Sequence, residues 1–553
     1  MNRLVLKLNI IVLAAVIVLT SCSQKHDSEK DISLRISEII ELISDSAATD
    51  QIETYYQPDM ISELYRKSGK MFSPLWNDRE NIDQLTDFIA YVHLEGLNPE
   101  DYHISKIQSL KNKIVSGTGP YPEDVAELEL LLTDSYLLLA SHLGRGKINS
   151  VTIDPHWHAL NRNPDVNWTE FIENTLKERS VKETLNSLTP KHREYANLKK
   201  ALERYLRIED NGGWLPFVTR LRKLEKGMNH PDVAILRQRL SVTQDEIPFD
   251  SLNADYFDDL LDQEVLIFQM RNGLKPDGVV GPKTIEALNI PVEERVASIR
   301  ANLERWRWLS DRLGERYIQV NIANFELQLI ENGKTIFQTE AVVGRPYRKT
   351  PVFSSRMTYL VFNPDWTIPP NILRNDIIPA VIKDPDYLSQ RKMKVIGRDG
   401  LEIDPGSIDW KNAASKGFNQ IIRQEPGPDN ALGLVKFMFP NQHNVYIHDT
   451  PSRELFSETE RTFSSGCIRI NQPMRLAEIL LDGNEGWNAD RIRRTLDENQ
   501  TRTVNLRSPV PVHLLYLTAW ADDEGTVYFR RDIYNRDEPL LSALRQSFGK
   551  VSG

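Results

Sequence analysis

The sequence predicts a multidomain α+β protein, in which a helical scaffold and a compact three-helix unit precede a mostly-β domain with a helical insertion. The chain has 553 residues, which is more than one ordinary hydrophobic core accommodates. Through its first half, apolar residues recur at three- and four-residue spacing, as in helices. Beyond residue 315 they alternate with polar residues, as in strands.

The first residues predict export from the cytoplasm. Residues 1–21 contain an apolar run, Ile10 to Leu19, that is too short to span a bilayer as a helix but suits a signal peptide. Small residues before Cys22 resemble a bacterial lipobox. The resemblance implies cleavage before Cys22, lipidation of its thiol and a solvated tether over residues 22–30. A plain secretory signal with a chance cysteine is the alternative.

Residues 31–225 predict a helical scaffold domain. The stretches "ISLRISEIIELI", "DVAELELLLTDSYLLLASHLG" and "ANLKKALERYLRIE" each place apolar residues at three- and four-residue spacing. Turn clusters such as "GTGPYPED" and "DNGGWLP" separate these stretches.

Residues 226–290 predict a three-helix domain. Two apolar stripes mark the first two helices: Val233, Leu236 and Leu240, then Leu261, Val265 and Phe268. Asp277-Gly278 marks a turn, and Pro282 suits the first position of a third helix. The pattern "FQ…NGL…DGVVGP.T…AL" resembles the peptidoglycan-binding domain. The resemblance implies attachment to cell-wall glycan or stem peptide; a spacer with this fold and no affinity is the alternative.

The rest of the chain predicts a linker helix at 291–314, a mostly-β domain at 315–535 and a C-terminal tail at 536–553. Asn332-Gly333 and the stretch Asp523-Glu524-Gly525 are hairpin signals. Residues 371–424 have helical stretches that interrupt the strands, so we expect an insertion there.

Cys467 is the candidate nucleophile. The chain has only two cysteines, so lipidation of Cys22 would leave Cys467 without a disulfide partner in the chain. A lone thiol in an exported protein is a liability unless it performs chemistry. An inert buried cysteine is the alternative.

His448 is the candidate general base because an imidazole can take the thiol proton and return it to a leaving amine. It ends the predicted strand "NVYIH", where Asn444, Tyr446 and His448 share one face and Val445 and Ile447 the other. The loop that follows is long enough to bring Cys467 back beside His448; a structural histidine is the alternative.

Neighbours of Cys467 suggest further roles. Gly466 permits a tight turn and close approach of a substrate, and N–H groups near Gly466 and Cys467, with the Ser465 hydroxyl, could form an oxyanion hole. Arg469 shares a face with Cys467 if "CIRI" is extended and could hold a substrate carboxylate. A salt bridge from Arg469 to acids of the preceding loop is the alternative.

These residues occur in a recognisable order. "HDTPSRELF…SSGCIRI" closely resembles the signature of the L,D-transpeptidase catalytic domain, and "VVGRPYRKTPVF", "FNPDWTIPPNI" and "GPDNALGLVKFMFPN" resemble other segments of that family. With the scaffold, the peptidoglycan-binding domain and the insertion, nearly the whole chain resembles the large, cap-bearing murein L,D-transpeptidases. The resemblance makes the insertion a substrate cap and makes Trp366 and Tyr446 candidate substrate contacts.

The chain departs from much of that family at Ser465, where a histidine is common. This departure leaves His448 as the only histidine of the motif and leaves the side-chain part of the oxyanion hole open. The group that orients His448 also stays open at this point: a backbone carbonyl and Asp449 are both candidates.

The resemblance implies acyl transfer between peptidoglycan stem peptides, forming 3→3 cross-links through a Cys467 thioester, with acylation by carbapenem-type inhibitors. An L,D-carboxypeptidase or hydrolase with the same thioester and a wall-anchoring structural lipoprotein are the alternatives. We expect a periplasmic lipoprotein in the inner or outer membrane, with no metal or organic cofactor. The net charge of −10 argues against a nucleic-acid partner.

Overall fold

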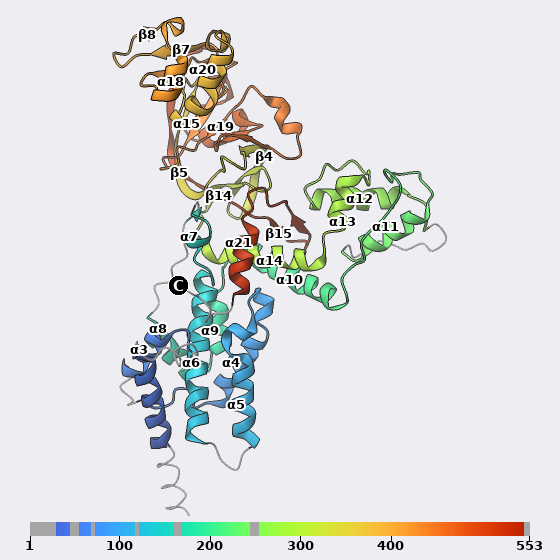
Figure 1. Cartoon of the computed structure of the whole chain (residues 1–553), viewed down its shortest axis with the longest axis vertical. Helices are drawn as coiled ribbons and strands as arrows, with labels where there is room; N and C mark the ends of the chain where they lie inside the picture. The colour runs from blue at the N-terminus through green and yellow to red at the C-terminus, as the bar shows by residue number, and fades with distance from the viewer. Residues whose placement is uncertain are drawn as a thin grey trace, which may run out of the picture.

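A computed structural model of the chain describes residues 29–44, 55–67, 72–116, 121–155, 157–159, 167–243 and 254–546. The predicted signal peptide, Cys22 and the tether up to residue 28 lie outside the described residues, and residues 29–44 are helical. Over the described ranges, no helix is long and apolar enough to cross a membrane. The scaffold forms one end of the molecule, the β-rich domain the other, and the three-helix domain projects from the side (Figure 1).

The scaffold is a bundle built around α6 (Pro122–Arg145). This helix is buried along most of its length, because it carries apolar residues on nearly all faces and neighbouring helices surround it. The surrounding helices are α3 (Pro58–Lys67), α4 (Arg79–Ala90), α5 (Ile104–Ser116), α8 (Trp168–Glu178) and α9 (Val181–Ser187). Short helices η1 (Val92–Glu95), η2 (Pro99–Tyr102) and α7 (Ser150–Ile153) connect them, and α10 (Arg193–Asp210) leads out of the bundle.

The three-helix domain contains α11 (Pro231–Ser241), α12 (Asp259–Arg271) and α13 (Pro282–Leu288), as the sequence predicts. Both predicted apolar stripes are buried in its core. Gln269 ties the turn to α12: its Nε2 donates to Asp277 Oδ1 at 2.9 Å and to the Val279 carbonyl at 3.0 Å. Its Oε1 accepts from the N–H groups of Asp277 and Gly278, both at 3.0 Å. The "FQ…DG" pattern therefore specifies a turn that is locked by hydrogen bonds.

The β-rich domain is built on one mixed sheet of order β1-β5-β10-β11-β13-β4-β3-β2-β14, with β12 on β4. Because β14 also pairs with β5, the sheet closes on itself. The strands are β1 (Trp157–His158), β2 (Arg316–Asn321), β3 (Glu326–Glu331), β4 (Lys334–Gly344), β5 (Val352–Phe362), β10 (Val435–Met438), β11 (Ile447–His448), β12 (Thr462–Ser464), β13 (Ile468–Ile470) and β14 (Arg502–Leu515).

Both predicted hairpins form. Asn332 and Gly333 join β3 to β4 with φ of 50° and 73°, the left-handed conformations that an Asn-Gly turn requires. β15 (Ala519–Ala521) and β16 (Val527–Phe529) form the second hairpin. Helices α19 (Pro473–Leu481) and α20 (Ala489–Asp497) complete the domain.

The insertion at 371–424, called the cap below, has a core of its own. It contains α15 (Pro370–Ile372), the π-helix η3 (Leu373–Ile377), α16 (Ile378–Lys383), α17 (Tyr387–Gln390), the 3₁₀ turn η4 (Pro405–Ser407) and α18 (Trp410–Lys416). It also contributes β9 (Ile421–Gln424), β7 (Met393–Ile396) and β8 (Glu402–Ile403) to a small sheet, whose edge strand β6 (Trp366–Thr367) lies just before the insertion. The cap therefore contains strands as well as the helices that the sequence predicts. The sequence does not reveal these strands, because strands of four residues or fewer leave little alternation.

The predicted linker helix, α14 (Val292–Trp308), is a central element of the molecule. It packs against α10, against α6 of the scaffold and against α21 (Asp537–Arg545). The segment predicted as a tail therefore begins with a docked helix, whose Leu540 is buried. Figure 1 shows α21 lying against α14 between the two ends of the molecule.

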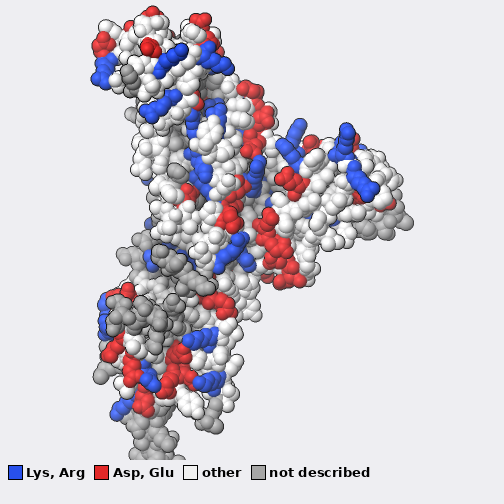
Figure 2. All heavy atoms as spheres, viewed as in Figure 1, with Lys and Arg blue, Asp and Glu red and all other residues white. Residues whose placement is uncertain are grey.

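The scaffold and the β-rich domain interlock at β1, which follows the scaffold's short helix α7 in the chain. It pairs in parallel with β5, with Trp157 opposite Val352 and His158 opposite Phe353. Trp157 is 1% exposed and packs edge-on against Trp308 of α14. Acidic and basic side chains are interspersed on the face shown in Figure 2, so the net charge of −10 does not form a single patch there.

Removing one partner of a buried ion pair tests how firmly α21 is docked. Arg305 Nη2 lies 2.6 Å from Asp537 Oδ1, and the Arg305 side chain is 2% exposed. We expect Asp537→Ala to lower the free energy of unfolding by about 3–5 kcal/mol, because it leaves a buried guanidinium without its carboxylate. Urea denaturation followed by circular dichroism measures the change.

Glu538→Ala is the matched control on the same helix. Glu538 and Arg545 form an exposed pair with a separation of 3.4 Å, so we expect a change within about 0.5 kcal/mol. Equal losses for Asp537→Ala and Glu538→Ala would show that the buried pair does not hold the helix.

Candidate functional site

Strand pairing brings the predicted nucleophile and base together. β11 and β13 are parallel, with Ile447 opposite Ile468 and His448 opposite Arg469. The Ile468 N–H donates to the Tyr446 carbonyl at 3.1 Å, which extends the register back to Cys467. Side chains alternate along strands, so Tyr446, His448, Cys467 and Arg469 share one face, as the sequence predicts. Ile447 and Ile468 fill the core on the other face.

The Cys467 thiol is half-buried, and its Sγ lies 3.8 Å from the Asn444 carbonyl oxygen, to which it donates. Burial raises the pKa of Cys467. The nearby N–H and hydroxyl of Tyr446, together with the charge of Arg469, lower it. The sulfur is therefore a thiol at neutral pH, with donors already placed to stabilise a thiolate once one forms.

The imidazole of His448 is buried and held in one tautomer. Its Nδ1 lies 2.5 Å from the Asp449 carbonyl oxygen. Because a carbonyl only accepts, Nδ1 carries the proton and Nε2 keeps its lone pair. Burial, and secondarily the charge of Arg469, lowers the pKa of His448 to about 3. A neutral imidazole is the form that can take a proton from the thiol.

The orienting group for His448 is thus the Asp449 backbone carbonyl rather than the Asp449 carboxylate. That carboxylate accepts from the N–H groups of Leu434 at 2.8 Å and Thr450 at 2.7 Å, and it pairs with Arg453. It therefore fixes the loop after β11, and the loop in turn presents the carbonyl.

The turn before Cys467 has its own hydrogen bonds. Gly466 has a φ of +116°, which disfavours any residue with a side chain. Its N–H donates to Ser464 Oγ at 3.0 Å, and its carbonyl accepts from Thr350 Oγ1 at 2.9 Å. The Ser465 hydroxyl accepts from Arg348 Nη1 at 2.8 Å. The Gly466 N–H and the Ser465 hydroxyl are thus engaged within the protein here, and their oxyanion role stays a prediction.

Arg348 connects this turn to the cap, a contact that the sequence does not predict. Its Nη2 donates to Asp376 Oδ1 of the cap at 3.0 Å, and its Nη1 contacts Asp376 Oδ2. Asp376 lies in the π-helix η3, a conformation that often marks functional sites. The basic stretch "GRPYRK" indicates that positive charge lies here. Nothing local in the sequence indicates that its partner is a carboxylate 28 residues away.

The predicted substrate contacts lie at the same place. Burial raises the pKa of the Tyr446 hydroxyl; the nearby Cys467 acts in the same direction, and Trp366, where the cap sheet begins, acts against it. Arg469 is half-buried, and its Nε is buried without a hydrogen-bond partner among the described residues. Burial lowers the pKa of Arg469; Cys467 and Glu454 raise it, and Arg345 lowers it further. It is thus placed to accept a carboxylate from a ligand.

Within the described ranges, no three His, Cys, Asp or Glu side chains are grouped so that they could hold a metal ion. The arrangement instead offers a thiol, a neutral imidazole, a phenol and a guanidinium on one face. These groups can perform nucleophilic acyl transfer.

Comparisons with known proteins agree with the three-domain organisation. Residues 59–202 match the family model described as "Scaffold domain", residues 229–288 match "Putative peptidoglycan binding domain", and residues 315–493 match "L,D-transpeptidase catalytic domain". Each match falls within the corresponding predicted domain, and together they confirm the multidomain α+β class.

One curated relative is "Putative L,D-transpeptidase" of Haemophilus influenzae, which is 37% identical over 223 residues, 40% of this chain. The chain spans 45% of that relative's length. Among solved structures, an L,D-transpeptidase (residues 123–326) from Xylanimonas cellulosilytica is 16% identical, with a TM-score of 0.16 over 54% of this chain and 100% of that one. L,D-transpeptidase 1 of Mycobacterium tuberculosis is 13% identical, with a TM-score of 0.14 over 36% and 61% of the two chains. Neither structural similarity carries an argument.

The protonation states predict how the thiol reacts with pH. Because burial raises the pKa of Cys467 and holds the pKa of His448 at about 3, neither group titrates between pH 5 and 7. We expect alkylation of Cys467 by iodoacetamide to be slow in this range and to keep accelerating above the ordinary thiol pKa, because the pKa of Cys467 is raised. Peptide-level mass spectrometry of the Cys467 peptide measures the rate. A fast plateau between pH 5 and 7, the mark of a thiolate–imidazolium pair, would contradict this.

Proposed function

The chain carries an L,D-transpeptidase catalytic domain, and we propose that it forms 3→3 cross-links between peptidoglycan stem peptides through a thioester on Cys467. The observation that carries the proposal is the parallel pairing of β11 with β13, which puts His448 and Cys467 on one face of the sheet. The match to a peptidoglycan binding domain at 229–288 supports the choice of polymer.

Acylation begins when Sγ attacks the carbonyl of the L-configured centre of the diamino acid in a donor stem. As the S–C bond forms, the thiol proton passes to Nε2 of His448, which is unprotonated at neutral pH because its pKa is about 3. The C–N bond to the terminal D-alanine then breaks, and the imidazolium returns the proton to the leaving amine. A thioester remains on Cys467.

Deacylation reverses these roles. The side-chain amine of a second stem attacks the thioester and gives a proton to His448, the C–S bond breaks, and the sulfur recovers the proton. The low pKa of His448 favours the two steps in which the imidazolium returns a proton and opposes the two in which the imidazole takes one up.

Four further side chains are proposed to hold the donor stem. Arg469 offers a guanidinium with an unpartnered buried Nε to a stem carboxylate, and Tyr446 and Trp366 line the approach to the sulfur. Arg348 now binds Asp376 of the cap, so a substrate carboxylate that replaced Asp376 would release the cap from the turn before Cys467. The Cys467 N–H is proposed as an oxyanion donor, joined by the Ser465 hydroxyl and the Gly466 N–H if they exchange their internal partners.

Two alternatives use the same chain differently. Water in place of the second amine would make the protein an L,D-carboxypeptidase or hydrolase, and an unreactive Cys467 would leave a wall-anchoring lipoprotein. In each case we propose that the N-terminal segment directs the protein to the periplasm and that Cys22 carries a lipid.

Muropeptide analysis tests the proposal. In a strain without other enzymes of this type, we expect Cys467→Ala to abolish 3→3 dimers, because no other described group on this face is a comparable nucleophile. Liquid chromatography with mass spectrometry measures the dimers. Tripeptide stems without dimers in the wild type would favour the carboxypeptidase.

A carbapenem provides the matched chemical test on purified protein. We expect the intact mass of the wild type to increase by one drug molecule and that of Cys467→Ala to stay unchanged, while thermal melting shows both proteins folded. An unmodified wild type would refute the reactive-thiol mechanism and leave the anchoring alternative.

A further inference from the structure

A large cavity lies between the three-helix domain and the β-rich domain, away from the thiol. Its volume is about 940 Å³, within the range of ligand pockets. One wall comes from the end of α12, the following turn and α13, and the other from β16 and the segment Ser457–Arg461. Neither Cys467 nor His448 lines it.

The two walls are fastened to each other beside the cavity. Arg530 Nη1 donates to the Arg271 carbonyl at 2.9 Å, and Arg271 Nε donates to the Val527 carbonyl at 3.1 Å. Arg295 stacks over the Phe529 ring at 4.4 Å. Gly273, with a φ of +66°, approaches Arg530 so closely that an added Cβ would lie 2.7 Å from its Cδ. These contacts therefore join the two domains directly beside the cavity.

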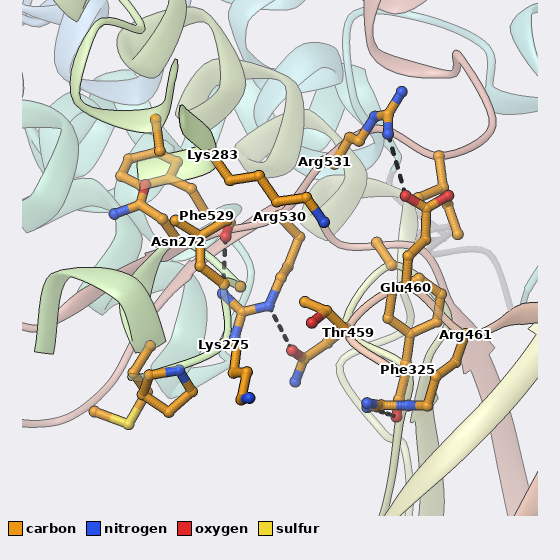
Figure 3. Close-up of a pocket in the computed structure, with 18 of the residues that line it drawn as sticks. Asn272, Lys275, Lys283, Phe325, Thr459, Glu460, Arg461, Phe529, Arg530 and Arg531 are labelled. Carbon is orange, nitrogen blue, oxygen red and sulfur yellow. Dashed lines mark hydrogen bonds and ion pairs between the residues drawn. The ribbon is translucent and has the colours of Figure 1, made fainter. Parts of the chain in front are cut away.

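The lining supplies unused positive charge. Lys275 and Lys283 are exposed in the cavity, and the part of the chain that the structure describes records no carboxylate partner for either. Figure 3 shows Lys283 extending into the space between the walls, while Arg531 is paired with Glu460 at 3.1 Å. Four exposed carboxylates also line the cavity, those of Glu286, Glu340, Glu458 and Glu460, so the lining offers partners for both signs of charge.

Apolar and neutral polar groups complete the surface. Leu274 and Phe325 offer apolar contacts on opposite walls, and the exposed Thr459 offers a hydroxyl. A ligand that fits must therefore combine carboxylates with apolar and amide portions, as an acidic peptide does; a neutral sugar alone would leave both ammonium groups unused.

The cavity also touches the segment that leads to the nucleophile. Ser457–Arg461 lies between His448 and Cys467 in the chain, and Arg461 binds the Phe325 and Ala341 carbonyls at 3.0 and 3.2 Å. β12 follows at once and pairs with β4 beside the site. A ligand in the cavity would therefore contact residues Ser457–Arg461, just before β12.

We propose that this interdomain cavity is a second binding site for the acidic stem peptide of a peptidoglycan strand, with Lys275 and Lys283 receiving its carboxylates. The inference rests on the proposed function for the identity of the polymer. In this arrangement the three-helix domain and the β-rich domain together hold the polymer in the seam between them while chemistry proceeds at Cys467.

A titration of the full-length protein tests the site. The protein is first acylated at Cys467 with a carbapenem, verified by intact mass, so that the thiol is blocked. A disaccharide tetrapeptide is then titrated calorimetrically. We expect binding that weakens with added salt and that Lys275→Glu with Lys283→Glu weakens roughly tenfold or more, because each reversal replaces a charge-assisted contact by repulsion.

The matched control reverses two lysines at the start of the three-helix domain, outside the cavity. Lys223 and Lys226 form exposed pairs with Glu225 and Asp259, both at 2.7 Å. We expect Lys223→Glu with Lys226→Glu to change the dissociation constant by about twofold or less, since exposed charges outside the cavity contribute little to binding within it. Thermal melting verifies that both double variants are folded.

Three outcomes would overturn the site: no binding to the acylated wild type, equal losses in both double variants, or equally tight binding of a neutral chito-oligosaccharide of similar size. Failure of the carbapenem to acylate the wild type would instead count against the proposed function. The same titration on the unacylated chain would then still decide whether the cavity binds the stem peptide.

Discussion

The parallel hydrogen bonding of β11 to β13 is the constraint on which the site depends. A shift of one residue in this register would turn Cys467 or His448 into the core, where Ile447 and Ile468 now pack. The register is held by burial of those isoleucines and by the loop that Asp449 ties back to Leu434, Thr450 and Arg453. Core packing and catalytic geometry are therefore set by the same few residues.

Helix α14 couples the rest of the molecule to this sheet. Three charged residues near its C-terminal end are buried with partners: Glu304 binds Arg307, and Arg305 binds Asp537 of α21. The pairing of β1 with β5 adds a second connection from the scaffold. The site thus lies in a molecule whose domains share buried elements, in contrast to domains joined by a flexible linker.

The sequence predicts the site better than its surroundings. Strand alternation was enough to place Tyr446, His448 and Cys467 on one face, and Asn-Gly was enough for a hairpin, because both signals are local. The Arg348–Asp376 contact and the central packing of α14 have no local signal, because buried charges look like exposed ones until their distant partners are known.

The proposed acyl transfer requires a neutral His448 that is protonated at Nδ1 and can take the thiol proton at Nε2. Nuclear magnetic resonance of ¹⁵N-histidine-labelled protein, with the signal assigned by its loss in His448→Gln, measures this state. We expect one neutral Nδ1–H tautomer throughout pH 5 to 8, because the pKa of His448 is about 3 and the Asp449 carbonyl accepts from Nδ1. An imidazolium at pH 6, or a proton resident on Nε2, would contradict it.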